Sequence, residues 1–117
     1  MESYRFVDFN QIMEVADGSS QLVHDLINMF FKQVQTFSEQ LDSLYQSGDF
    51  ISLGKLAHKI KGSAAMMGIT ELANYMKELE HLAKEKLQVE KYPELINKYK
   101  TISAEAVEEL KDIAKRI

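Results

Sequence analysis

The sequence contains no cysteine, which excludes disulfide bonds and thiolate metal sites. It has one proline in 117 residues and no β-hairpin signals, and this scarcity favours helices. No apolar run approaches the roughly 18 residues needed to cross a membrane. The first residues, Met1–Arg5, are not followed by the apolar segment of a secretion signal. We therefore expect a cytoplasmic protein without membrane insertion.

Chain length and charge limit the number of domains and the kinds of partner. A chain of 117 residues, 45% hydrophobic and 27% charged, is expected to form a single domain over residues 1–117. The net charge of −4 argues against nucleic acid as a partner. The charge is unevenly distributed, because residues 50–70 contain three lysines and no Asp or Glu. That one basic segment is a candidate surface for an acidic partner.

Turn and capping residues divide the chain into helices. Asp17-Gly18-Ser19 is expected to break a first helix and cap the second, Gly48-Asp49 to separate the second and third, and Gly68 to end the third. Thr70 is expected to cap the fourth helix, and Pro93 to lie in the first turn of the last. The predicted spans are about 9–16, 20–47, 50–67, a fourth from residue 70, and a last helix to near the C-terminus.

Apolar residues recur at three- and four-residue steps within these spans. In the second helix the stripe consists of Leu22, Leu26, Phe30, Val34, Phe37, Leu41 and Leu44. Short connections favour antiparallel packing of successive helices. The predicted fold is all-α, an antiparallel up-down four-helix bundle with a short extra N-terminal helix.

One histidine lies on the polar side of the third predicted helix. At 100° per residue, His58 falls opposite the apolar stripe, with Gly54, Gly62 and Ala65 as small neighbours. Glycine inside a helix costs roughly 1 kcal/mol relative to alanine, so clearance beside this ring is predicted to have a use. Lys61 lies within reach of the ring. An uncovered imidazole beside a cation is typical of a nucleophile that accepts an anionic group, and a phosphoryl group fits best.

The residues around this histidine form a recognisable pattern. His58-Lys59-Ile60-Lys61-Gly62-Ser63-Ala64, followed by Gly68 and Leu79-Glu80, resembles the histidine-containing phosphotransfer (HPt) domain of bacterial multistep phosphorelays. Asp17-Gly18-Ser19, Phe30 and Gly48-Asp49 also match the family pattern. The resemblance covers about residues 9–87.

The resemblance implies a phosphoryl carrier. His58 would accept a phosphoryl group, by family analogy on Nε2, from a receiver-domain aspartate and pass it to another receiver. Lys61 would neutralise phosphate charge, and Gly62 would give clearance. The partners would be response-regulator receiver domains and a hybrid sensor kinase, and the chain would be a monomer. We expect no intrinsic cofactor or metal, because the Mg²⁺ ion would belong to the receiver.

Partner docking is expected beside the histidine. The docking residues predicted are Gly54, Lys55, Lys59, Ala65 and Met66. Met66 is included because half-exposed methionines suit adaptable surfaces. By contrast, we assign Glu80 to helix solubility, and His24 and His81 to the solvated surface.

Two alternatives to the phosphorelay carrier remain open. One is the phosphorylated-histidine domain of a chemotaxis-type kinase, which shares the bundle and a similar motif. The other is a helical adaptor that binds partners without phosphorylation. The chain lacks a glycine-rich phosphate loop, so we expect no autonomous kinase activity.

Overall fold

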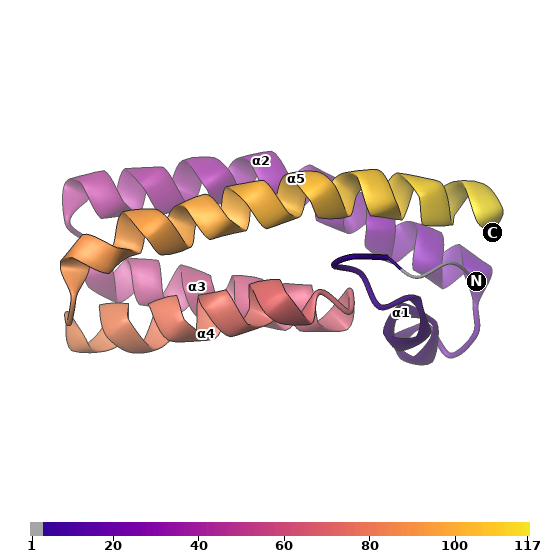
Figure 1. Cartoon of the computed structure of the whole chain (residues 1–117), viewed down its shortest axis with the longest axis horizontal. Helices are drawn as coiled ribbons and strands as arrows, with labels where there is room; N and C mark the ends of the chain where they lie inside the picture. Colours follow the sequence, from indigo (N-terminus) through magenta and orange to yellow (C-terminus); the bar gives the residue numbers. More distant parts are fainter. Residues whose placement is uncertain (1–3) are drawn as a thin grey trace.

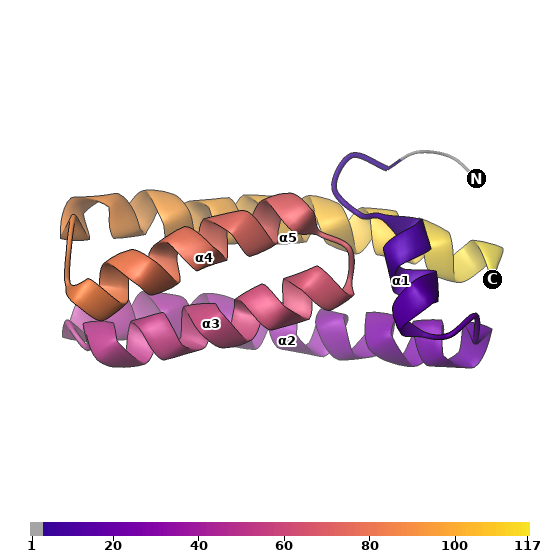
Figure 2. The ribbon, with the colours of Figure 1, turned by 90° about the horizontal axis from the view of Figure 1, so that it is seen from below.

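The computed structural model describes residues 4–117, and this part of the chain is built from helices. They are α1 (Phe9–Val15), α2 (Ser20–Ser47), α3 (Phe50–Met66), α4 (Thr70–Glu85), the 3₁₀ helix η1 (Val89–Lys91) and α5 (Tyr92–Arg116). Figures 1 and 2 show α2 to α5 side by side, each running opposite to the one before it. The predicted antiparallel four-helix bundle with an extra N-terminal helix is confirmed.

The turns between helices follow from a few short side chains. Ser19 and Asp49 cap α2 and α3 by accepting hydrogen bonds from the backbone N–H groups of Leu22 and Ser52, at 3.1 and 3.2 Å. Gly48 and Gly68 end α2 and α3 as predicted, with φ values of 72° and 70°, the left-handed conformation that is common after a helix. These turn assignments are confirmed.

Two details of the helix assignment are wrong. Thr70 is the first residue of α4 rather than its cap, because the N-cap position is taken by Ile69, which is fully buried and has no capping side chain. Leu22 is 40% exposed, whereas Val23 and Ile27 are buried on α2. The core therefore meets the first turns of α2 at Val23 rather than at its neighbour Leu22.

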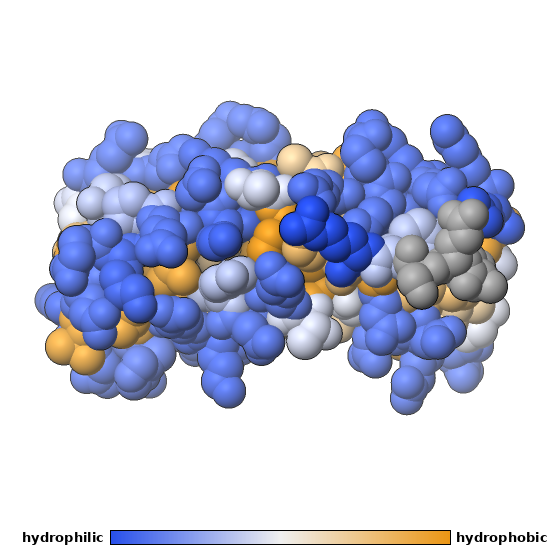
Figure 3. Space-filling view, viewed as in Figure 1, coloured by the Kyte–Doolittle hydropathy of each residue, from blue (hydrophilic) through white to orange (hydrophobic). Residues whose placement is uncertain are grey.

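The helices of the bundle differ in length. In Figure 2, α2 and α5 extend past the turn that joins α3 to α4, and α1 lies across the end of that shorter pair. Ile12 of α1 is fully buried, so α1 closes the core at this end. The surface is largely hydrophilic on the face shown in Figure 3, with hydrophobic side chains visible near the middle of the face and at the end where α4 leads into α5. None of the described helices is long and apolar enough to cross a bilayer.

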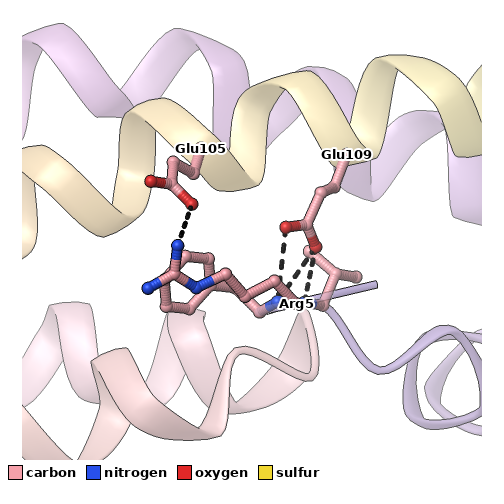
Figure 4. A network of polar contacts seen from close by, with 5 residues as sticks. Arg5, Glu105 and Glu109 are labelled. Carbon is pink, nitrogen blue, oxygen red and sulfur yellow. Dashed lines mark hydrogen bonds and ion pairs between the residues drawn. The ribbon is translucent and has the colours of Figure 1, made fainter. Parts of the chain in front are cut away.

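The segment before α1 is held to α5 by polar contacts (Figure 4). The Glu109 carboxylate accepts hydrogen bonds from the backbone N–H groups of Phe6 and Val7, at 3.1 and 3.0 Å, and Arg5 forms an ion pair with Glu105 at 3.5 Å. The N–H of Asp8 then donates to the carbonyl of Gly68 at 2.9 Å. This path ties the N-terminal segment to both α5 and the α3–α4 turn.

Gly68 is expected to be the glycine least tolerant of substitution. An added Cβ would stand 2.5 Å from the Asp8 carbonyl oxygen, in a backbone with φ of 70°. We predict that Gly68→Ala lowers the free energy of unfolding by about 2–4 kcal/mol, from left-handed strain of about 1–2 kcal/mol plus this clash. Gly48→Ala is the control, since it has the same strain and no atom within 4 Å. Equal losses in urea unfolding of the two variants would contradict the prediction.

Candidate functional site

His58 lies in the middle of α3 and points away from the core. The residues of α3 that face the core, Leu53, Ala57, Ile60 and Ala64, are buried. The His58 side chain is 66% exposed. The structure confirms the predicted outward position of this imidazole.

Glu80 of α4 joins His58 to Lys61. One carboxylate oxygen lies 2.8 Å from Nδ1 of His58, and the other accepts a hydrogen bond from Nζ of Lys61 at 2.7 Å. The Glu80 side chain is only 25% exposed. Its assignment to helix solubility is therefore wrong. The sequence does offer a weak signal, because a carboxylate on α4 is the natural counterion of an α3 segment that contains only basic charges.

The Glu80 carboxylate determines which nitrogen of the His58 ring carries a proton. Its hydrogen bond with Lys61 lowers the pKa of Glu80 below its usual value, and the His58 hydrogen bond lowers it further. Glu80 is thus ionised near neutral pH and can only accept, so Nδ1 of His58 carries a proton. In the neutral imidazole the other nitrogen, Nε2, then bears the free lone pair. The site presents an exposed nitrogen nucleophile with a fixed tautomer.

The two glycines beside His58 have different roles. Gly62 is exposed, and an added Cβ would meet no atom within 4 Å. Gly54 is buried, and its Cβ would stand 3.4 Å from the backbone O of Glu80 and N of Lys84. Gly54 is therefore not the open surface residue that the sequence suggested. It lies at the close approach of α3 to α4 and contributes to the lining of the groove between them. Gly62 leaves the more open space of the two.

A groove between α2 and α3 lies on one side of the histidine helix. Met29, Phe37, Gly62 and Met66 contribute to its mainly apolar lining. Lys59, predicted to dock a partner, extends over this groove with Nζ 5.6 Å from the centre of the Phe37 ring, a cation–π distance. Met66 and Met29 are 44% and 54% exposed, which is high for such side chains.

The remaining predicted residues are distributed around this centre. Lys55 lines a second groove, between α3 and α4, which also contains His58 and Glu80. Ala65 is exposed and lines neither of the two grooves. Ser63 donates a hydrogen bond to Gln33 of α2 at 3.3 Å, in keeping with its assignment to the helix interface. Among the described residues, no three His, Asp or Glu side chains are placed to hold a metal ion.

The different surroundings of the two glycines predict different changes in stability on substitution. Gly62→Ala should raise the free energy of unfolding by up to about 1 kcal/mol, because alanine favours a helix and nothing is displaced. Gly54→Ala should gain less or lose stability, since the methyl group must fit against the α4 backbone. Urea unfolding of both variants measures the difference. If the Gly62 variant proved less stable than the wild type, the space beside His58 would not be free.

Comparisons with known proteins agree with this geometry. A family model described as the Hpt domain matches residues 25–116. The structure is similar to the crystal structure of histidine-containing phosphotransfer protein B (HptB) from Pseudomonas aeruginosa PAO1. The TM-score is 0.87 with 27% identity, and the match covers 98% of this chain and 99% of that one. Phosphorelay intermediate protein YPD1 of Candida albicans is 25% identical over 73 residues, which are 62% of this chain and only 40% of that relative.

Proposed function

The chain belongs to the Hpt domain family, and we propose that it is a histidine phosphotransfer protein whose phosphoryl group is carried by His58. The observation that carries the proposal is the exposed imidazole whose Nδ1 is bound to Glu80 and whose Nε2 is open. We propose that the donor is the aspartyl phosphate of a receiver domain and that a second receiver is the acceptor. The Mg²⁺ ion needed for transfer would be bound by the receiver.

The transfer step uses groups that this site holds. The Nε2 lone pair attacks phosphorus, the bond between phosphorus and the aspartyl oxygen breaks, and the aspartate leaves as a carboxylate. The Nδ1 proton stays on the ring, where the Glu80 carboxylate stabilises the positive charge that the imidazole acquires. The reverse reaction, with another receiver aspartate as nucleophile, delivers the phosphoryl group onward.

Lys61 is our candidate for neutralising phosphate charge. It stands one turn after His58 on α3, and its ammonium is hydrogen-bonded to Glu80, on the same carboxylate that holds the ring. A phosphoryl group on Nε2 would add negative charge within reach of this flexible side chain. We propose that Lys61 then exchanges Glu80 for a phosphoryl oxygen.

We propose that the apolar α2–α3 groove is where a receiver docks. Its exposed methionines supply apolar area along the helix that carries the nucleophile, and Gly62 leaves space beside His58. Lys59 sits at the same groove and offers a charge to an acidic receiver. We further propose that the chain acts as a monomer in the cytoplasm, is supplied through a hybrid sensor kinase, and has no kinase activity of its own.

The central test is phosphorylation of a His58→Gln variant. Wild type mixed with a phosphorylated receiver domain should acquire an acid-labile, alkali-stable label, and the variant should acquire none. The variant should remain folded, because a side chain that is 66% exposed contributes little to packing. Circular dichroism is the folding control. Normal labelling of the variant would contradict the assignment, and labelling only by a chemotaxis-type kinase domain would favour that alternative.

Glu80 variants test the positioning of the ring. Glu80→Ala should slow transfer by about 10- to 100-fold, because it removes a charge-assisted hydrogen bond worth roughly 1.5–3 kcal/mol. Glu80→Gln should lose less, since its amide oxygen still accepts from Nδ1. The fraction of neutral His58 with its proton on Nδ1, measured from imidazole ¹⁵N shifts, should fall in the order wild type, Gln, Ala. Unchanged proton positions in the Ala variant would show that Glu80 does not orient the nucleophile.

A further inference from the structure

The second groove beside His58 runs between α3 and α4. Ile51, Lys55 and His58 line it at helical spacing on α3, and Glu80 and Lys84 line it on α4. Because α3 and α4 are antiparallel, Lys55 and Lys84 both lie on the side of the site nearer the start of α3. The groove thus has the nucleophile at one end and a pair of lysines beyond it.

Positive charge exceeds negative charge around these two lysines. Within residues 4–117, neither Lys55 nor Lys84 forms an ion pair, and both are exposed. Glu80, the acidic residue of the groove, is already bound to Lys61 and His58. Asp49 at the start of α3 acts on Lys55 only through space. The groove is therefore a local excess of positive charge on a chain whose net charge is −4.

An apolar side chain marks the outer part of the same groove. Ile51 is 45% exposed, one turn before Lys55 on α3. The α2–α3 groove on the other flank of α3 is built differently, with methionines and aromatic rings in place of a lysine pair. The two grooves flank the helix that carries His58. The α2–α3 groove favours an apolar partner surface, whereas the α3–α4 groove favours an acidic one.

We propose that the α3–α4 groove is a second contact surface for receiver domains, an inference that rests on the proposed function. We further propose that Lys55 and Lys84 select those receivers whose loops beside the phosphorylated aspartate carry acidic residues. The occupant is one such loop, with carboxylates facing the two lysines and an apolar residue against Ile51. Charges at the edge of an interface act mainly on the association rate and on the choice of partner. The apolar α2–α3 groove then supplies affinity common to all receivers, whereas the lysine pair distinguishes among them.

Charge reversal tests this assignment. The variants are Lys55→Glu, Lys84→Glu and the double variant, with Lys115→Glu near the end of α5 as a control for the same change in net charge. The probe is a phosphorylated receiver domain that transfers to wild type and carries Asp or Glu in those loops. The double variant should lower the second-order rate constant about ten-fold or more at low salt, and the loss should shrink at about 0.5 M salt. Lys115→Glu should change it less than about two-fold.

A compensating change in the receiver makes the test specific. Replacing the acidic loop residues of the receiver by lysine should slow transfer to wild type and restore much of the rate to the double variant. A damaged α3 would produce no such rescue, and a general effect of net charge would slow and rescue Lys115→Glu in the same way. If the double variant behaved like Lys115→Glu, or if the receiver change gave no rescue, the proposal would be overturned.

Phosphoramidate separates this proposal from the proposed function. This small donor loses ammonia when its P–N bond breaks and a new bond forms to the imidazole nitrogen, so no receiver is needed. Its rate of labelling should fall far less than the receiver-dependent rate in the double variant. A parallel fall with both donors would make the lysines a site for the phosphate itself, and would overturn their role in partner choice. Labelling that is unaffected by His58→Gln would instead overturn the proposed function.

Discussion

The close approach of α3 to α4 is the constraint on which the site depends. Gly54 lies at this approach, and a Cβ there would stand 3.4 Å from the backbone O of Glu80 and N of Lys84, which leaves little room for a larger side chain. At this separation the carboxylate of Glu80 reaches both Nδ1 of His58 and Nζ of Lys61, at 2.8 and 2.7 Å. The packing of α3 against α4 thus orients the nucleophile.

Gly62 shows the opposite balance between packing and function. A glycine in a helix interior costs roughly 1 kcal/mol, and at position 62 no neighbouring atom needs the space. The glycine lowers helix stability, but it keeps space open next to His58, at the edge of the apolar α2–α3 groove. Proteins commonly accept such costs at functional sites and compensate elsewhere. The buried core that runs the length of the bundle provides that compensation here.

Periodicity and turn residues in the sequence predict the bundle, the glycines that end α2 and α3, and the outward position of His58. These features depend on neighbours within one helix or one turn, which the sequence displays directly. The Glu80 contacts and the buried position of Gly54 depend on the register between two helices, and the period of 3.6 residues does not contain that information. The start of α4 also depends on packing between helices. Ile69 is buried in the core and takes the N-cap position that the sequence pattern assigns to Thr70.

The proposed phosphotransfer depends on one atom, Nε2 of His58. The direct measurement is NMR of the phosphorylated chain carrying ¹⁵N-labelled histidine, in which ¹⁵N–³¹P coupling identifies the nitrogen bonded to phosphorus. We predict a phosphoryl group on Nε2, with Nδ1 still protonated and hydrogen-bonded to Glu80. A phosphoryl group on Nδ1, or on His24 or His81, would contradict it.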